Sequence, residues 1–189
     1  NAFPIVALIS FLIGLIMAFQ AAIPMKQFGA EIFVADLIAL STLRELGPLM
    51  TAIVMAGRTS SAFAAELGTM KVNEEVDALT TMGLDPVRFL VLTRVIATLF
   101  MMPLITIFAN LFGILGGSVV LLSMGYPLNT YIDRIIQSAD YVDLLGGLLK
   151  SLAFGLIVAG IGCSHGLRTR TGASAVGDST TKAVVSGII

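Results

Sequence analysis

Long stretches almost free of charge alternate with short polar segments along this chain. Residues 2–25 and 95–124 carry no charged side chain, and residues 144–166 carry only Lys150. A helix of about 20 apolar residues is long enough to cross the hydrocarbon core of a bilayer. The pattern therefore predicts membrane-spanning helices at about residues 3–25, 86–124 and 144–166, the first of them closed by Pro24.

A further apolar stretch, at about residues 34–67, is interrupted by charge. It carries Asp36, Arg44, Glu45 and Arg58, and Glu66 lies at its end. The uncharged pieces are too short to span alone, so Arg44 and Glu45 must lie at membrane depth if the stretch crosses. Gly47-Pro48 is expected to kink this helix near its middle.

The end of the chain predicts the start of a fifth span at residues 183–189, preceded by a hydrophilic loop at 167–182. The first residue is Asn, and the last lies inside an apolar run, so we expect the sequence to be part of a longer protein. The fold class expected is an all-α integral membrane protein, a polytopic helical bundle of about five spans forming a single transmembrane domain over residues 1–189.

The polar linker after the second span predicts a short amphipathic helix at about residues 73–82. Asn73 is expected to cap it, with Glu74 and Glu75 in the first turn, where the positive end of the helix dipole favours carboxylates. Val76 and Leu79 fall near one face. The glycine at position 83 is typical of the residue that follows a helix, and Asp85-Pro86 is typical of the next helix start.

Lys and Arg are unevenly distributed among the connections. Six lie in alternate connections on one side, namely Lys71, Arg88, Arg94, Arg168, Arg170 and Lys182. The opposite connections hold only Lys26 and Arg134. Since positive residues accumulate on the cytoplasmic side, the short amphipathic helix is expected in the cytoplasm and the loop containing Tyr131 outside.

Composition agrees with a membrane protein and excludes several other classes. Hydrophobic residues make up 57% and charged residues 12%, and the mean hydropathy is +0.97. No basic cluster points to nucleic acid. The single cysteine, Cys163, rules out an internal disulfide framework, and it lies two residues from His165, on a different helix face, so no metal site or cofactor is predicted.

Three charged residues inside the spans are the candidates for a functional site. Arg44 and Glu45 are costly in lipid and are expected to face a bundle interior or a wet cavity. Being adjacent on a helix, they need separate partners or a local break. The alternative is that they only fix the packing of the spans. Lys150 is expected either to extend to the interface or to lie near an anionic lipid headgroup.

Small residues spaced four apart predict close helix packing on two spans. The rows are Gly57, Ser61 and Ala65 on the second span, and Gly147, Ser151 and Gly155 on the fourth. The acidic residues Glu74, Glu75 and Asp77 suit a different contact, because they lie on a short helix held between two spans. A basic groove on a partner protein could fix the register of that helix, which would then act as a lever.

Residues 44–97 resemble the signature region of MlaE-type permeases. They contain RELGP, AGR, AAELGTM, an EE-DAL helix and a helix that begins with DP, in that order. The resemblance implies an MlaE-type ABC permease fold and a non-catalytic subunit of a system that moves phospholipids between the inner and outer membranes. It places Arg44, Glu45 and Lys150 near a lipid cavity.

The resemblance also implies a set of partners and a location. Two copies would form the core in the bacterial inner membrane, with a cytoplasmic ABC ATPase, a small STAS-domain subunit and a hexameric periplasmic MCE-domain protein. The short helix at about residues 73–82 would be the coupling helix, on which the ATPase docks. Its contact residues would be Glu74, Glu75, Val76, Asp77 and Leu79. Two alternatives stay open: a secondary transporter or channel with Arg44 and Glu45 on an ion path, and a structural membrane scaffold.

Overall fold

The computed structural model describes residues 2–170 and 172–189, and in this part of the chain the regular structure is helical, with no strand. Four helical runs are long and apolar enough to cross a membrane: Phe3–Gln27, Phe33–Val72, Val87–Ser123 and Tyr141–Leu167. These runs match the four complete spans expected from the sequence. The predicted all-α, polytopic membrane fold is confirmed.

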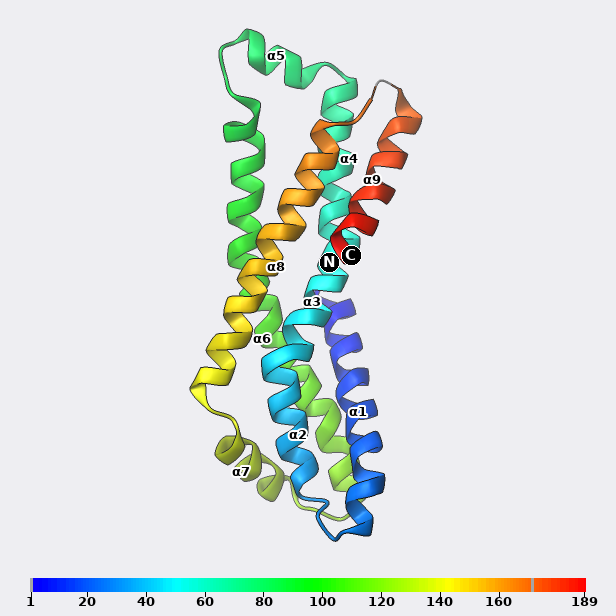
Figure 1. Ribbon diagram of the computed structural model, residues 1–189, viewed down its shortest axis with the longest axis vertical. Coiled ribbons are helices and arrows are strands. Elements are labelled where there is room, and N and C mark those ends of the chain that lie inside the picture. The colour runs from blue at the N-terminus through cyan, green and yellow to red at the C-terminus, as the bar shows by residue number, and fades with distance from the viewer. Residues whose placement is uncertain (1, 171) are drawn as a thin grey trace. The chain divides into compact units, whose positions relative to one another are not determined.

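The helical elements follow one another with short connections (Figure 1). Their bounds are α1 Phe3–Gln27, α2 Phe33–Ser41, η1 Thr42–Leu46, α3 Gly47–Met55, η2 Ala56–Ser60, α4 Ser61–Val72, α5 Glu75–Thr81, η3 Val87–Val91, α6 Leu92–Ser123, α7 Leu128–Ser138, α8 Tyr141–Leu167 and α9 Ala173–Ile188. The elements η1, η2 and η3 are π-helical turns inside or at the start of longer helices.

Three helix boundaries differ from the expectation. Pro24 does not close the first span but lies inside α1, which continues to Gln27, because a proline near the last turn removes only one backbone hydrogen bond. The second span continues to Val72. Asn73 therefore follows the end of α4, and Glu74 precedes α5 with a left-handed backbone, φ 62°. Asn73 is not the N-cap that we expected.

The segment before the expected fifth span is also helical. The helix α9 begins at Ala173 rather than at residue 183, after Gly172, whose φ of 112° separates it from α8. Thr180 and Thr181 satisfy their hydroxyls by donating to the carbonyl of Gly177, so polar side chains fit within the helix. The expected loop at 167–182 is thus much shorter, and α9 is not among the four span-length helices.

The chain forms two compact units. Unit 1 consists of the residues up to Thr51 together with Pro103–Ser151, and unit 2 consists of Ala52–Met102 together with Leu152–Ile189. The helices α3, α6 and α8 each begin in one unit and continue into the other.

Unit 1 is held together by close helix contact. A Cβ atom added at Gly14 of α1 would lie 1.9 Å from the carbonyl oxygen of Gly113 on α6, and one added at Gly116 would lie 2.1 Å from the carbonyl oxygen of Phe11. The glycines of α6 therefore admit a neighbouring helix, as their sequence predicts. Tyr131 of α7 is 2% exposed and donates a hydrogen bond of 2.8 Å to the Ile114 carbonyl.

A second contact at the same end of unit 1 links the loop between α1 and α2 to the loop between α6 and α7. The hydroxyl of Tyr126 donates to Oε2 of Glu31 over 2.7 Å. This hydrogen bond raises the pKa of Tyr126 above its ordinary value, with burial and the carboxylate charge adding to the effect. The phenol therefore stays protonated and continues to donate.

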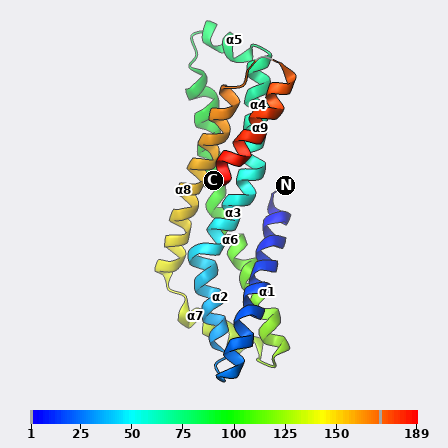
Figure 2. The same cartoon turned by 45° about the vertical axis from the view of Figure 1, so that its right-hand side comes forward.

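Unit 2 packs α9 along α4, as both views show (Figures 1 and 2). Its buried cluster joins Leu67, Val76, Leu90 and Cys163. Val76 belongs to α5, which lies across the ends of α4 and of the η3–α6 helix in Figure 1. The apolar face of α5 is thus inserted into unit 2, and its acidic face remains exposed.

Candidate functional site

The π-helical turn η1 places two adjacent charged residues on different partners. Arg44 and Glu45 lie within Thr42–Leu46, immediately before Gly47-Pro48. The wider turn changes the angle between successive side chains, and proline cannot donate the hydrogen bond that a regular helix would require. Both solutions expected from the sequence are therefore present, a local break and separate partners.

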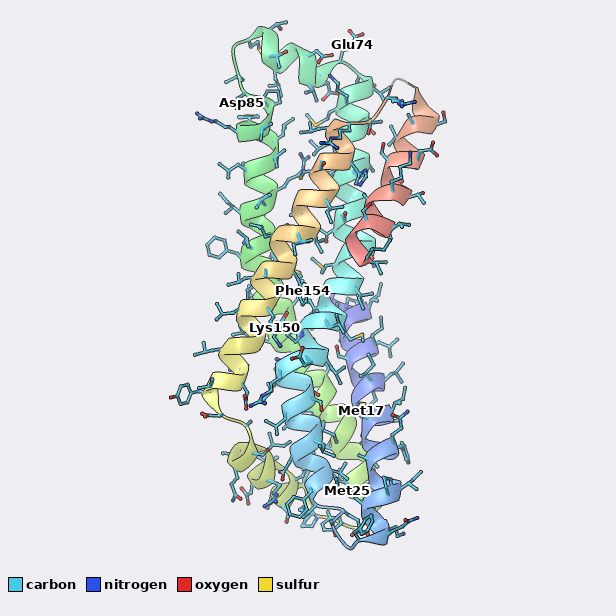
Figure 3. The ribbon with its side chains drawn as sticks, in the orientation of Figure 1. Met17, Met25, Glu74, Asp85, Lys150 and Phe154 are labelled. Carbon is cyan, nitrogen blue, oxygen red and sulfur yellow. The ribbon has the colours of Figure 1, made fainter. Side chains whose placement is uncertain are left out.

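Each of the two residues pairs with α8. Nε of Arg44 donates to Oδ1 of Asp143 over 2.5 Å. Nζ of Lys150 forms an ion pair with Glu45 and also donates to the carbonyl oxygen of Arg44 over 3.2 Å. Figure 3 shows Lys150 on α8. The four side chains thus form two ion pairs, each with one cation and one anion.

These four side chains line a cavity of about 310 Å³ in unit 1. Its lining consists of Arg44, Glu45, Val142, Asp143, Gly146, Gly147 and Lys150. Gly147 shapes the wall, because an added Cβ would lie 2.1 Å from the carbonyl oxygen of Leu43. The close approach brings α8 near enough to η1 for the ion pairs to form.

Exposure differs sharply within the cluster. The side chain of Asp143 is 7% exposed, whereas those of Lys150, Arg44 and Glu45 are 45%, 58% and 67% exposed. Charged groups at membrane depth are not stable against lipid chains and turn toward protein or a wet cavity. The exposed side of this cluster therefore requires a polar neighbour, such as water, a polar ligand or another protein surface.

The sequence pattern does not predict Asp143 as part of this site, because the apolar run of the fourth span begins at residue 144. The helix α8 starts at Tyr141, so Asp143 lies in its first turn. Its spacing of seven from Lys150 was the available signal, because residues seven apart share a helix face. Lys150 is also deeper in its helix than expected, and its ammonium pairs with Glu45 in place of extending to the interface.

The short helix α5 is a second candidate site. Glu74 and Asp85 mark the two ends of its segment in Figure 3. Gly83, with φ 79°, ends the helix: its N–H binds the Thr80 carbonyl, and the N–H of Leu84 binds the Leu79 carbonyl. Oδ1 of Asp85 accepts from the N–H of Val87 and starts the next helix, as expected.

The side chains expected to meet an ATPase divide between two faces of α5. Glu74, Glu75 and Asp77 are exposed, and Asp77 pairs with Lys71 over 2.7 Å. Val76 is 6% exposed, and Leu79 packs beside it against the core of unit 2. Val76 and Leu79 therefore anchor α5 to its own chain, and the acidic face stays exposed.

The small-residue rows occupy different environments. On α8, Gly147, Ser151 and Gly155 are buried, and a Cβ added at Gly155 would lie 2.9 Å from Met102. On η2 and α4 the contact is shifted by one residue. Gly57 has open space beside it, and Ser61 and Ala65 are only partly buried.

The neighbouring row makes the close contacts within unit 2. A Cβ at Gly162 of α8 would lie 2.7 Å from the carbonyl of Ser60, and one at Gly187 of α9 would lie 3.3 Å from Ala56. Ala64 is likewise buried, near Gly166. The close contacts within unit 2 thus use the adjacent row, Ala56, Ser60 and Ala64, and a packing role for Gly57, Ser61 and Ala65 stays a prediction.

Cys163 and His165 have separate environments. Cys163 is buried in the core of unit 2, and Nε2 of His165 lies 3.2 Å from the hydroxyl of Ser186. Among the described residues, no three His, Cys, Asp or Glu side chains are grouped closely enough to hold a metal ion.

Comparison with known proteins gives a consistent result. The family model described as Permease MlaE matches residues 1–189. A probable ABC transporter permease protein of Rickettsia typhi is 37% identical over 100% of this chain and 73% of its own length, and one of Synechocystis is 42% identical over 94% and 68%. The intermembrane phospholipid transport system permease protein MlaE of Haemophilus influenzae is 33% identical over 96% of this chain and 70% of its own length.

The family match covers the elements that build both candidate sites, since it includes η1, α5 and α8. The chain belongs to the MlaE permease family and is an ABC transporter permease.

Proposed function

We propose that this chain is the membrane-spanning subunit of an ABC complex that moves phospholipids between the inner and outer bacterial membranes. The name of the Haemophilus influenzae relative, an intermembrane phospholipid transport system permease, supports the choice of substrate. The permease provides the path for the lipid, and ATP is hydrolysed by a partner subunit.

The observation that carries the proposal is the charged cavity inside the spans. A phospholipid headgroup presents a phosphate and, in zwitterionic lipids, an amine. Arg44 and Lys150 offer partly exposed cations for the phosphate, and Glu45 offers a carboxylate for an amine. Asp143, buried beneath Arg44, holds the guanidinium in place. The cluster would orient a headgroup while acyl chains contact apolar helix faces.

The acidic face of α5 is the proposed docking site for the ATPase. The helix is connected to α4 at one end and to η3 and α6 at the other, and Val76 fixes it to the core of unit 2. A push on Glu74, Glu75 and Asp77 would therefore move two spans together. The long helix α6 continues into unit 1, where the charged cavity lies.

The remaining partners follow the family resemblance. The complex would contain two copies of this chain in the inner membrane, a small STAS-domain subunit and a hexameric periplasmic MCE-domain protein. The exposed side of the Arg44–Lys150 cluster would then face the space between the two copies, which satisfies its need for a polar neighbour.

A lipid-transfer assay tests the substrate. Full-length permease is reconstituted in liposomes with its ATPase, and transfer of labelled phospholipid is measured with and without ATP. We expect ATP-dependent transfer that falls at least tenfold in a Glu45→Gln, Lys150→Gln variant that still retains the ATPase. Transfer that is unchanged without ATP would instead favour a secondary transporter.

Copurification tests the docking face. A Glu74→Lys, Glu75→Lys, Asp77→Lys variant should lose at least tenfold in ATPase retention, because repulsion replaces attraction at the contact. A matched control, Asp133→Lys with Asp140→Lys, reverses exposed acidic residues of unit 1 and should retain the ATPase. Equal retention by both variants would remove α5 from the interface.

A further inference from the structure

A second polar cavity lies in unit 2, where α8 ends and α9 begins. Its volume is about 310 Å³. Its lining consists of His165, Arg168, Arg170, Ala175, Asp178, Ser179 and Lys182. It shares no residue with the Arg44–Lys150 cavity, and neither the proposed lipid path nor the docking face on α5 uses it.

The walls of this cavity are fixed by contacts between α8 and α9. The hydroxyl of Thr169, a residue 6% exposed, donates to the hydroxyl of Ser179 over 2.9 Å. Nε2 of His165 lies 3.2 Å from the hydroxyl of Ser186. These two contacts hold the end of α8 against α9. The cavity is therefore formed before a ligand binds, and binding would not require the helices to become ordered.

The lining is predominantly cationic. Arg168, Arg170 and Lys182 contribute three positive charges, and Asp178 contributes one negative charge. No ion pair within 4 Å joins any of these three cations to a carboxylate among the described residues, whereas Arg44, Arg94, Arg134 and Lys150 all have such a partner. The first turn of α9 also borders the cavity at Ala175, which adds the partial positive charge of a helix N-terminus.

The position along α8 specifies the kind of anion. The span-length helix ends at Leu167, and Arg168 follows at once. Cations placed directly beyond the end of a span lie at the level of the lipid headgroups, where basic pockets between helices bind anionic lipids. Arginine forks suit the oxygens of a phosphate, and the lysine adds a point charge.

We infer that this cavity binds the phosphate of an anionic phospholipid from the leaflet at that end of α8. The site would anchor the α8–α9 corner to the membrane surface. The inference goes beyond the proposed function and does not depend on which molecule the complex transports. Inorganic phosphate has the same chemistry without acyl chains, so the test must separate the two.

Native mass spectrometry of the detergent-solubilised full-length protein measures the binding. Phosphatidylglycerol and phosphatidylcholine are titrated separately, with and without inorganic phosphate as competitor. We expect phosphatidylglycerol to be retained preferentially. Each cation near the surface contributes about fivefold in affinity, so an Arg168→Gln, Arg170→Gln, Lys182→Gln variant should lose on the order of 100-fold.

Two further variants keep the inference falsifiable. Arg88→Gln removes an exposed cation of unit 2 outside the cavity and should leave binding unchanged. Asp178→Asn removes the one carboxylate in the lining and should tighten binding severalfold, which provides a test even if the triple variant does not fold. Equal retention of the two lipids by the wild type, displacement of phosphatidylglycerol by millimolar inorganic phosphate, or unchanged binding in Asp178→Asn would each overturn the inference.

Discussion

Among the described residues, two of the three ion pairs in unit 1 shield their carboxylates, whereas the ion pairs in unit 2 leave theirs exposed. Asp143 and Asp36, the partners of Arg44 and Arg134, are 7% and 21% exposed. The third carboxylate of unit 1, Glu45, is 67% exposed and lines the charged cavity. The carboxylates of Asp77, Asp85 and Glu66 in unit 2 are 54–60% exposed. Ion pairs join helices in both units, but the most deeply shielded carboxylate, Asp143, lies in unit 1 and depends most on its partner cation.

The two units also differ in what a lost partner would cost. A buried carboxylate without its cation is left uncompensated, which is strongly destabilising. An exposed pair contributes little, because water screens it and solvates either member alone. Substitutions at the shielded carboxylates of unit 1 should therefore affect folding, whereas substitutions at the exposed charges of either unit should affect mainly binding.

The largest loss of stability is expected at the close contact between α1 and α6 in unit 1. In Gly14→Ala the new Cβ would meet the Gly113 carbonyl at 1.9 Å, so α1 and α6 must separate. We expect a loss of about 3 kcal/mol in the free energy of unfolding. The measurement is thermal loss of helical circular dichroism in detergent, combined with dye labelling of the buried Cys163.

Gly160→Ala on α8 is the matched control, because open space surrounds Gly160. Alanine is the better helix former, so this variant should be neutral or slightly stabilised. Similar losses in both variants would contradict the view that helix contact limits substitution in unit 1.

A smaller effect is expected from the buried ion pair. Arg44→Gln leaves Asp143 without its cation and should cost about 2 kcal/mol, less than a fully buried pair would, because the Arg44 side chain is 58% exposed. Arg88→Gln, which breaks the exposed pair with Asp85, should change stability little. Thermal unfolding in detergent compares the two.

The double variant Arg44→Gln, Asp143→Asn sharpens the test. It removes both charges, so at least half of the lost stability should return. No recovery would show that Arg44 stabilises unit 1 through contacts other than its pair with Asp143.

Features with a strong local signal were predictable from the sequence. The four spans follow from the length of their apolar runs, and the end of α5 follows from Gly83 and Asp85-Pro86. The paired position of Arg44 and Glu45 followed from the cost of charge in lipid, because that cost demands a partner whatever the fold.

Features set by tertiary contact were not predictable. The partner of Arg44 depends on how α8 meets η1. The spacing of seven between Asp143 and Lys150 places the two on one helix face but does not identify the residues that this face meets. The choice between the small-residue rows beginning at Ala56 and at Gly57 depends on the rotation of one helix. The early start of α9 reflects hydroxyl groups that bind backbone carbonyls, which a hydropathy pattern does not detect.

The smallest effect on stability is expected at the end of α5, in unit 2. Gly83 has a φ of 79°, which an alanine adopts only with strain, although no atom lies within 4 Å of an added Cβ. Gly83→Ala should therefore cost about 1 kcal/mol, by backbone strain alone. The readouts are thermal unfolding and retention of the ATPase by the full-length protein.

The control for Gly83→Ala is Gly177→Ala in α9, where the space is equally open but the backbone is helical. In Gly83→Ala the backbone strain would be released by a shift of α5, the helix that carries Glu75 and Asp77. If α5 docks on the ATPase, this shift should weaken ATPase retention by more than the small loss of stability explains. Unchanged retention would mean that the geometry of this turn serves only folding, and the contrast between the two units would then rest on the charges alone.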